Sequence, residues 1–491
     1  MNKKIVQTGS SVKSSDILKE IFPDPLAPTA GTLDDALAAS FYPEDSTRLA
    51  HMRQACSTAQ RIVSQTGCEG ELAGKITTAA LFHDIGYSEK LSRTGFHPLD
   101  GAVYLAHCDA PEDIVEAVLW HSSTPVDIEY KPEIKEIYDR LPRPDLRGPV
   151  HSAVRYCDFR TSPVGEPFSF GQRIVELEGR FGLGSIPPQT ARRLLPEARR
   201  VQNMYSREIA GQQHRNLPWI FCDIDGTLIE PGQSLDRRSL AAINRYTTAG
   251  GRFSLVTGKH MISVPELIQS VGSHNPHAGV NGSVIIRDGR ISLFGETVEP
   301  CEEIENILLR ENINYATYVT DGIWSRSDLS AEQINAFAMV GEVLPQSGPT
   351  PLANGVIKIL TFSHRSQRKQ CEFVRALAAE FGLNCVRTGE EFLEIGPAGH
   401  GKHSAAMQIM KEAGWPDLNS IAIGDSENDL SLFARAGLSA AVANAAPEVL
   451  PAADLHIPSC RECGVARLLD ALLDSAKDGQ WSIPANWLVD Y

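Results

Sequence analysis

The sequence predicts a protein of several domains, in which an all-α part is followed by an α/β part with a parallel sheet. The chain has 491 residues, which is too long for a single hydrophobic core. Between residues 45 and 212 the apolar residues recur at helical spacing almost throughout, and strand signals are nearly absent. After residue 218 short apolar runs alternate with helical segments, which is typical of a parallel sheet covered by helices.

The predicted helical part follows an N-terminal arm of residues 1–40, in which the apolar pattern is weak and we expect one short helix. Asp45 and Ser46 can cap a first helix, because short polar side chains accept hydrogen bonds from the free N–H groups of a first turn. Further helical spacing is found over residues 70–84, 98–107, 111–121, 149–158, 169–181 and 189–211. We therefore expect one all-α domain over residues 41–213.

The predicted α/β part begins after Leu217 and Pro218 with the apolar strand WIFC. The runs RFSLV, VIKILTF, EFLEIG and SIAIG predict further strands, and SVIIRDGRISLFG predicts a hairpin that turns at Asp288 and Gly289. Helical segments are predicted over residues 236–249, 261–271, 402–413 and 427–436. This alternation of strands and helices predicts a parallel sheet with helices on both faces.

Composition and charge exclude several classes of partner. The formal net charge of −15 argues against binding nucleic acid through its phosphates. No stretch approaches the length of a membrane span, about eighteen apolar residues, and the N-terminus has no apolar signal segment. The ten cysteines are scattered, which indicates reduced thiols. We therefore expect a cytoplasmic protein with neither a nucleic-acid nor a membrane partner, and a homo-oligomer is left open.

Polar residues follow the predicted strands of the α/β part at four places. Asp223 and Asp225 follow WIFC, and Thr257 follows FSLV. Lys402 stands at a helix start after two glycines, and the segment from Asp425 to Asp429 follows SIAI. Because an open parallel sheet places its active site at the carboxyl ends of its strands, we expect these residues to meet.

These residue types suit the transfer of a phosphoryl group. Residues i and i+2 of a strand end point to the same side, so the two aspartates Asp223 and Asp225 could share one site. Such a pair needs a cation or a proton, and carboxylate oxygens suit Mg²⁺. One carboxylate can attack a phosphoryl group, and a second can protonate the leaving oxygen and then activate water. A solvated turn or a helix cap is the alternative for this aspartate pair, and it leaves Lys402 and the Asp425 segment unexplained.

These motifs resemble the haloacid dehalogenase-like (HAD) hydrolases, in particular the sugar-phosphatase-like branch with an α/β cap. The resemblance rests on "CDIDGTL", "VTGKH", "VNGSVI", "LEIGPAGHGKHSAA", "IAIGDSENDLSLFARAG" and "AVANAAPEVLPAAD", in that order. It implies a Rossmann-like core over residues 216–290 and 392–478 with an α/β cap inserted at 291–391. It also implies a Mg²⁺-dependent phosphatase that acts on a small phosphorylated metabolite such as a sugar phosphate.

The resemblance assigns roles to individual residues. Asp223 is the nucleophile and a Mg²⁺ ligand, and Asp225 is the general acid and base with its backbone carbonyl on the metal. Thr257 and Lys402 hold the phosphoryl group, and Asp425 binds the metal together with its partner Asp429. The substrate-binding residues that it implies are Gly258, Asn281, Asn428 and Asn444. One departure is Lys259, where this branch commonly has Arg, because Lys keeps the charge but loses the planar fork.

A second set of residues that can bind metal lies in the helical part. It consists of His51, His83, Asp84, His97, His121 and Asp158, each in or beside a predicted helix with apolar neighbours. A lone buried histidine is usually a hydrogen-bonded core side chain, but four histidines and two aspartates are harder to explain in this way. Imidazole and carboxylate ligands on several helices can form a metal site inside a helical bundle. Mixed nitrogen and oxygen ligands suit a divalent metal such as Mn²⁺ or Fe.

This pattern resembles the HD-domain metal-dependent phosphohydrolases over about residues 45–180. The motif H…HD…D maps to His51, to His83 with Asp84, and to Asp158. His97 and His121 match the additional histidines of members that bind two metals, and Asp84 then bridges. Some HD domains sense or bind a ligand without turning it over. The alternative is therefore a nucleotide-sensing or structural metal-binding module that regulates or oligomerises the phosphatase.

Overall fold

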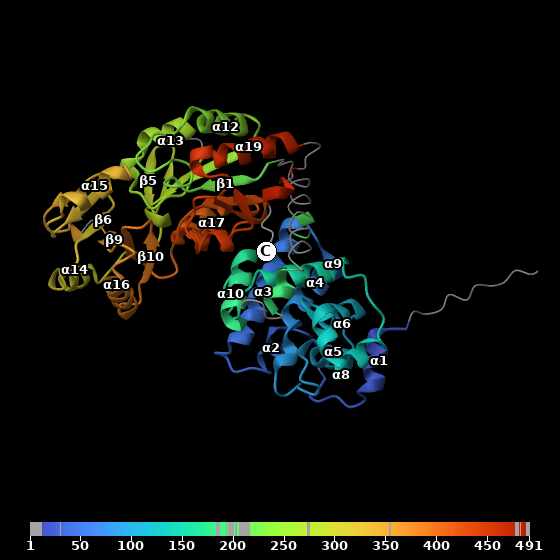
Figure 1. Cartoon of the computed structure of the whole chain (residues 1–491). Helices are drawn as coiled ribbons and strands as arrows, with labels where there is room; N and C mark the ends of the chain where they lie inside the picture. Colours follow the sequence, from blue (N-terminus) through green and yellow to red (C-terminus); the bar gives the residue numbers. More distant parts are fainter. Residues whose placement is uncertain are drawn as a thin grey trace, which may run out of the picture. The chain divides into compact units, whose positions relative to one another are not determined.

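The computed structural model describes residues 12–29, 31–182, 187–192, 194, 201, 204–205, 217–272, 275–352, 355–476, 481 and 483–487. The chain divides into two compact units, Met1–Tyr205 and Ser206–Tyr491 (Figure 1). The predicted domain boundaries at residues 213 and 216 fall outside the described residues, as does most of the predicted helix 189–211. The division of the chain into four parts therefore stays a prediction.

Helices are the main regular elements in the described part of the first unit, which also contains an isolated bridge between Thr161 and Pro167. Its elements are α1 (Ser14–Ile21), α2 (Asp35–Ala39), α3 (Thr47–Thr66), α4 (Gly70–Phe82), η1 (Ile85–Tyr87), α5 (His97–His107), α6 (Glu112–Leu119), α7 (Thr124–Asp127), η2 (Ile128–Tyr130), α8 (Pro132–Tyr138), α9 (Pro149–Phe159) and α10 (Phe170–Phe181). These helices lie close to the segments whose apolar spacing predicts them.

Helix α3 shows how the sequence positions a functional side chain in this unit. Its cap Ser46 accepts the N–H of Leu49, and the helix ends at Gly67 in the left-handed conformation. The helix packs against α4 and α9, and its buried face carries Leu49, His51, Met52 and Ala55. A histidine therefore occupies a position that an apolar residue would otherwise fill.

The segment predicted as an N-terminal arm contains helix α1, which packs against α5 and α6. Leu18 of this helix is fully buried, and the Ser14 hydroxyl donates to the Glu116 carboxylate over 3.1 Å.

The second unit contains a parallel five-stranded sheet in the order β14-β13-β12-β1-β2. The strands are β1 (Trp219–Cys222), β2 (Arg252–Leu255), β12 (Ser420–Gly424), β13 (Leu438–Val442) and β14 (Leu455–Ile457). Strand β1 lies between β12 and β2 and is buried along its whole length, which explains its unbroken apolar run.

Helices cover both faces of this sheet. They are α12 (Arg237–Thr248), η3 (Met261–Ser263), α13 (Pro265–Val271), α17 (Lys402–Glu412), α18 (Leu430–Phe433) and α19 (Gly464–Ser475), with short 3-10 turns between them. Helices α12 and α19 pack together on one side, and α17 lies on the other (Figure 1). A small antiparallel sheet of β3 (His277–Gly279), β4 (Val284–Arg287) and β5 (Arg290–Leu293) follows α13. Its hairpin turns at Asp288 and Gly289 as predicted, with positive φ at both residues.

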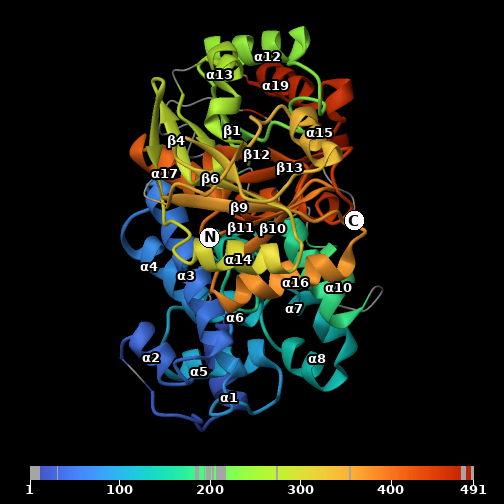
Figure 2. The same cartoon turned by 90° about the vertical axis from the view of Figure 1, so that its left-hand side faces the viewer.

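A second, mostly antiparallel sheet forms the inserted cap in the order β10-β11-β9-β6-β7-β8. Its strands are β6 (Tyr315–Val319), β7 (Gly322–Ser325), β8 (Gln346–Ser347), β9 (Val356–Phe362), β10 (Asn384–Thr388) and β11 (Phe392–Gly396). Helices α14 (Cys301–Arg310) and α16 (Arg368–Glu380) cover one face, and α15 (Ala331–Met339) lies on the other side (Figure 2).

The position of β11 corrects one predicted boundary. From the sequence, the cap is predicted to end at residue 391 and EFLEIG to belong to the core. In the structure this run pairs antiparallel with β9 and β10 and completes the cap sheet. A short apolar run before a glycine-rich loop looks the same in either sheet, so local sequence does not decide between them.

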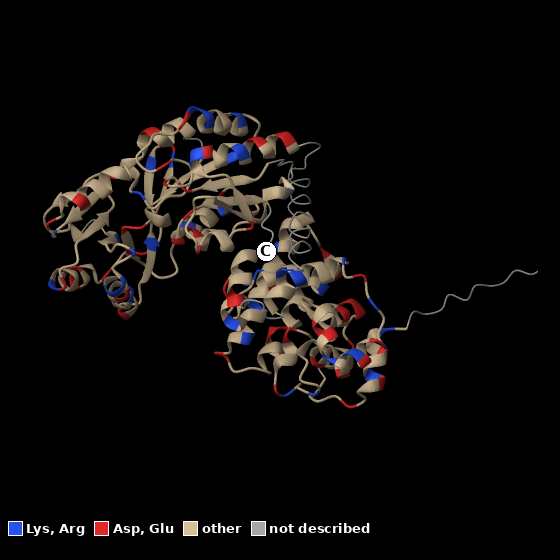
Figure 3. Ribbon diagram, in the orientation of Figure 1, with Lys and Arg blue, Asp and Glu red and all other residues tan. Residues whose placement is uncertain are grey.

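Charged residues of both signs are spread along the helices of each unit (Figure 3). Among the described helices, none combines the length and the apolar character that crossing a membrane requires.

Candidate active site

The predicted catalytic residues of the second unit converge at the carboxyl ends of three neighbouring strands. Asp223 directly follows β1, Thr257 follows β2, and Asp425 directly follows β12. Because β1 lies between β12 and β2, these ends lie side by side. Lys402, the first residue of α17, joins them from the side.

Lys402 is fully buried between two carboxylates. Its Nζ lies 2.6 Å from Asp223 Oδ1 and 2.7 Å from Asp429 Oδ1. The second carboxylate oxygen of Asp429 accepts the N–H groups of Asp425 and Ser426, each over 3.0 Å. Asp429 therefore fixes both the lysine and the loop that carries Asp425.

Asp223, Asp425 and Asp429 each offer one carboxylate oxygen, and these three oxygens lie within 4.8 Å of one another. Burial raises the pKa of Asp223 above its usual range and raises that of Asp425 to about 7. One ammonium group does not neutralise three buried carboxylates, so the site lacks positive charge. A hard divalent cation with oxygen ligands supplies that charge, and the residues present fit Mg²⁺.

The loop after β1 is shaped around Asp425. Thr227 donates its hydroxyl to Asp425 Oδ1 over 2.7 Å. Gly226 has φ +78°, and a Cβ at this position would lie 2.5 Å from Asp425 Oδ2. Asn444 donates to the Gly226 carbonyl over 2.7 Å and accepts the N–H of Cys460 over 2.9 Å, so in the structure it supports this loop.

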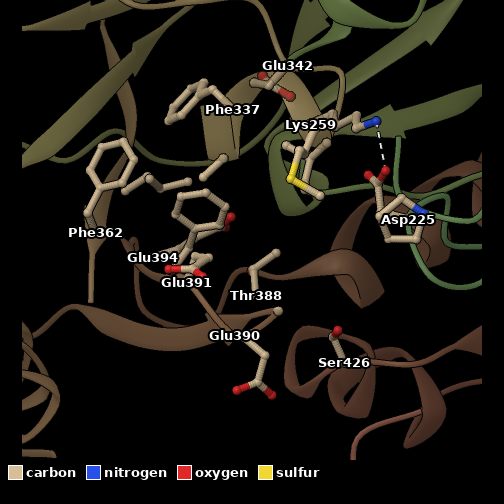
Figure 4. Close-up of a pocket in the computed structure, with 18 of the residues that line it drawn as sticks. Asp225, Lys259, Phe337, Glu342, Phe362, Thr388, Glu390, Glu391, Glu394 and Ser426 are labelled. Atoms are coloured by element: carbon tan, nitrogen blue, oxygen red, sulfur yellow. Dashed lines mark ion pairs between the residues drawn. The ribbon is translucent and has the colours of Figure 1, made fainter. Parts of the chain in front are cut away.

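Asp225 does not join the carboxylate cluster of Asp223. Its carboxylate pairs with Lys259 Nζ at 2.9 Å (Figure 4). Burial raises the pKa of Asp225, and the charge of Lys259 opposes the shift. Asp223 and Asp225 therefore line one cavity but have different partners. The partner of Asp225 is Lys259, the residue that departs from the HAD pattern.

Three of the four predicted substrate-binding residues, all except Asn444, belong to one chain of polar contacts. Asn428 donates to Asn281 Oδ1 over 2.9 Å, and the Asn281 amide donates to Glu394 of the cap. Gly258 accepts a hydrogen bond from Lys358 of the cap over 2.6 Å, and Thr257 Oγ1 accepts the N–H of Lys259 over 3.1 Å.

A cavity of about 840 Å³ lies between the core and the cap. On the core side Asp223, Asp225, Thr257, Gly258 and Asp425 line it. On the cap side its lining includes Tyr318, Phe337, Lys358, Phe362, Phe392 and Glu394 (Figure 4).

The six predicted residues of the first unit form two clusters. Nitrogen and oxygen atoms of His51, His83 and Asp158 lie within 4.8 Å of one another, as do those of Asp84, His97 and His121. Asp84 faces both clusters. Its Oδ1 lies 3.3 Å from Nε2 of His97 and of His121, and its Oδ2 lies 3.6 Å from Nε2 of His51 and of His83.

The orientation of the imidazoles in these clusters fits metal ligands. Nδ1 of His51, His83 and His121 contacts the backbone carbonyls of Ser162, Ala80 and Val118 at 2.8, 2.8 and 2.5 Å. A proton on each Nδ1 leaves the lone pair of Nε2 directed inward. The Nε2 atoms of His51 and His83 lie 3.1 Å apart, and those of His97 and His121 lie 3.2 Å apart. Imidazole nitrogens that face each other over such short distances suit a divalent cation between them.

Arginines surround this pair of clusters. Arg48 pairs with Asp84, and Arg173 lies 3.6 Å from Asp158. Together with Tyr87 and Arg180 they line a cavity of about 220 Å³ that also exposes His97 and His121. Candidate metal ligands and guanidinium groups that can bind an anion therefore line the same cavity.

Comparison with known proteins identifies the second unit. A sequence model described as haloacid dehalogenase-like hydrolase matches residues 220–469. The chain belongs to this family. The hydrolase is 25% identical over 260 residues to pyridoxal phosphate phosphatase YbhA of Escherichia coli. The aligned region covers 48% of this chain and 92% of that protein.

Two further similarities cover the same half of the hydrolase. It is 28% identical over 283 residues to 5-amino-6-(5-phospho-D-ribitylamino)uracil phosphatase YwtE of Bacillus subtilis, over 52% of this chain and 97% of that protein. A solved haloacid dehalogenase-like hydrolase from B. subtilis aligns with 52% of this chain and all of its own, with 22% identity and a TM-score of 0.47. The clusters around His83 and Asp84 lie outside the family match.

Sequence reasoning missed three residues that the hydrolase places at its active site. Thr227 stands in the quoted "DGT" motif, but its contact with Asp425 joins residues 198 positions apart. Lys358 and Glu394 form a buried ion pair at 2.9 Å between two cap strands. A lysine inside the apolar run VIKILTF was the available signal, because a buried ammonium group needs a partner.

Proposed function

We propose that the second unit is a Mg²⁺-dependent phosphatase that hydrolyses small phosphomonoesters through an aspartyl-phosphate. The observation that supports this most is the buried set of Asp223, Lys402, Asp425 and Asp429 at the end of β1. Family membership supports the same reaction, since the similar proteins from E. coli and B. subtilis are both phosphatases by name.

In the proposed first step, a carboxylate oxygen of Asp223 attacks phosphorus and the bond to the leaving oxygen breaks. Lys402 holds the carboxylate in place and reduces the repulsion between it and the anionic substrate. Thr257 and the backbone at Gly258 offer hydrogen bonds to the phosphoryl oxygens. Asp225 gives its proton to the leaving oxygen.

In the second step, Asp225 takes a proton from water, which attacks the aspartyl-phosphate and releases phosphate and free Asp223. Asp223, Asp425 and the backbone near Asp225 would hold Mg²⁺, which would supply positive charge to the phosphoryl group. The cap closes the cavity against bulk water and selects the leaving group.

The experiment that tests this proposal compares phosphate release by the wild type, Asp223→Asn and His83→Ala over a panel of phosphomonoesters with Mg²⁺. We expect Asp223→Asn to lose about 10³-fold or more and His83→Ala to keep wild-type activity. Full activity of Asp223→Asn would exclude the proposed mechanism, and loss in His83→Ala alone would assign the activity to the first unit.

A second candidate function concerns the first unit, which we propose is an HD-type metal-dependent phosphohydrolase. Support comes from the Asp84 carboxylate, whose two oxygens face two histidine clusters, and from the arginines around them. The two groups of side chains would hold two divalent cations, which would lower the pKa of a bound water molecule for attack on a phosphoester. The rival proposal is a module that senses a nucleotide or holds a structural metal and thereby regulates or oligomerises the phosphatase.

These rivals are separated in the Asp223→Asn background, in which the second unit is silent. Hydrolysis of any nucleotide or phosphodiester that is lost on Asp84→Ala supports the phosphohydrolase. Nucleotide binding without turnover, or a change of oligomeric state on Asp84→Ala, supports the rival.

A further inference from the structure

We propose that the substrate's leaving group is a ring that carries amino or hydroxyl donors and no second anionic group. This proposal rests on the proposed phosphatase function and names the substrate class of that site. It follows from two independent properties of the cavity, the aromatic surface of the cap and the charges around it.

The cap presents alternate residues of its strands to the cavity. Along β9, Lys358, Leu360 and Phe362 line the cavity, whereas Ile359 belongs to the apolar cluster under α14 and α16. Along β11, Phe392 and Glu394 line it. Because side chains of a strand alternate between the two faces of a sheet, one face of the cap sheet lines the cavity.

Three phenylalanines form a continuous aromatic wall at the far end. The ring centroids of Phe337 and Phe362 lie 5.5 Å apart, those of Phe362 and Phe392 lie 5.5 Å apart, and those of Phe337 and Phe392 lie 5.9 Å apart. Figure 4 shows Phe337 and Phe362 on the opposite side of the cavity from Asp225. A phosphoryl group at Asp223 therefore directs the rest of the substrate toward aromatic faces, which favour another ring.

Acidic side chains outnumber basic ones around the leaving-group part of the cavity. The carboxylates are Glu332, Glu342, Glu390, Glu391 and Glu394. Among the described lining residues the two ammonium groups already have partners. Lys358 pairs with Glu394 at 2.9 Å, and Lys259 pairs with Asp225 at 2.9 Å. A second phosphate or carboxylate on the substrate would therefore meet like charge without a free cation.

Glu342 offers the ring a specific polar contact. It is buried, and its Oε1 accepts the N–H of His260 over 2.8 Å. Figure 4 shows it between the aromatic wall and the pair of Lys259 and Asp225. Carboxylate oxygens accept hydrogen bonds, so Glu342, Glu390 and Glu391 favour amino and hydroxyl substituents.

Glu390 and Glu391 are exposed glutamates that line the cavity and have basic residues nearby. Glu390 lies 3.3 Å from Arg365, which also pairs with Glu448, and Glu391 lies 3.9 Å from His364. Both glutamate side chains remain more than half exposed, so their charge can be removed without disturbing the core. They are therefore suitable positions for a test.

The test measures kcat/KM of the full chain with Mg²⁺ for benzyl phosphate, 4-(aminomethyl)benzyl phosphate and 4-carboxybenzyl phosphate. These esters share a ring and a leaving oxygen and differ in charge. We expect the aminomethyl ester to exceed the carboxy ester by about tenfold or more. In the double variant Glu390→Gln/Glu391→Gln this ratio should fall by at least about threefold.

Glu380→Gln is the matched control, because it removes an exposed acid at the end of α16 that does not line the cavity. It should leave the ratio unchanged. Equal rates for the two charged esters, or a ratio that the double variant does not change, would overturn the proposal. If none of the three esters nor 4-nitrophenyl phosphate releases phosphate, the proposed phosphatase function itself fails.

Discussion

Lys402 and Asp223 form a buried ion pair, with 2.6 Å between Nζ and Oδ1. The pair joins the start of α17 to the end of β1 across 179 residues, and it fixes one carboxylate oxygen of the proposed nucleophile. In the proposed mechanism, the other carboxylate oxygen attacks phosphorus. Asp429 contacts the same ammonium at 2.7 Å, so the lysine stabilises two carboxylates at once.

Replacing Lys402 should affect both activity and folding. In Lys402→Met two buried carboxylates lose their cation, and we expect the free energy of unfolding to fall by about 3–5 kcal/mol. Phosphatase activity should be lost as well. Urea unfolding followed by tryptophan fluorescence measures the first effect, since five of the six tryptophans lie in the second unit.

Lys411→Met on the same helix is the control for Lys402, because this lysine is exposed. It should change neither stability nor activity. An active Lys402→Met protein with wild-type stability would contradict the role of the pair.

Gly226→Ala should weaken the metal site. The added Cβ would lie 2.5 Å from Asp425 Oδ2, so the proposed ligand must move. We expect kcat/KM to fall by about tenfold or more and the Mg²⁺ concentration for half-maximal activity to rise, because small displacements of catalytic groups are costly. Steady-state kinetics at varied Mg²⁺ measures both.

Gly232→Ala separates this displacement from backbone strain. Gly232 has φ +79°, close to the +78° of Gly226, but its nearest neighbour would lie 3.5 Å from the new Cβ. Both variants therefore bear the cost of a left-handed alanine, about 1 kcal/mol. If Gly232→Ala loses as much activity as Gly226→Ala, the displacement of Asp425 is not the cause.

His277 should make the second unit less stable in acid. Burial lowers its pKa to about 4, and its Nδ1 accepts the N–H of Leu255 over 3.0 Å. The unfolded chain binds the proton near pH 6.5. The contribution of neutral His277 is thus fully present above pH 6.5, and it is lost as the pH falls toward 4. The loss amounts to roughly 3 kcal/mol.

The measurement is urea unfolding at pH 7 and pH 4.5 for the wild type and His277→Gln. Glutamine can accept from the same N–H and does not titrate, so the variant should lose less stability than the wild type over this range. Equal losses in the two proteins would show that His277 is not responsible.

The first unit should bind two divalent cations, and Asp84→Ala should release both because its carboxylate faces both clusters. His83→Ala should release one. Elemental analysis of protein purified with Mn²⁺, in the Asp223→Asn/Asp425→Asn background, counts the metals. His107→Ala, at the other end of the α5 helix that starts at His97, should keep both. Full metal content in Asp84→Ala would contradict the bridging role.

The sequence predicts the positions of site residues that stand next to a strand end or a helix start. Asp223, Thr257, Lys402 and Asp425 stand directly beside their strands or helix, so strand order alone brings them together. In the first unit, four histidines and two aspartates in or beside predicted helices indicate a metal site, and the structure brings these side chains together in two groups.

Contacts between distant strands could not be predicted in this way. The sequence predicts that Asp223 and Asp225 can share one site, but it does not indicate that Lys259 pairs with Asp225. The pairing of Lys358 with Glu394, and the placement of β11 in the cap, depend on strand pairing that no local pattern specifies. These contacts determine the cavity, and this explains why the motifs alone left the leaving group open.

The most direct test of the central claim is to trap the phosphoryl group on the enzyme. Asp225→Asn is mixed with 4-nitrophenyl phosphate and Mg²⁺, because this leaving group departs without an acid and the missing base slows hydrolysis of the intermediate. After an acid quench and peptide mass spectrometry, the account predicts a phosphoryl group on Asp223 that is absent from Asp223→Asn/Asp225→Asn. A phosphoryl group on another residue, or one that persists without Asp223, would contradict it.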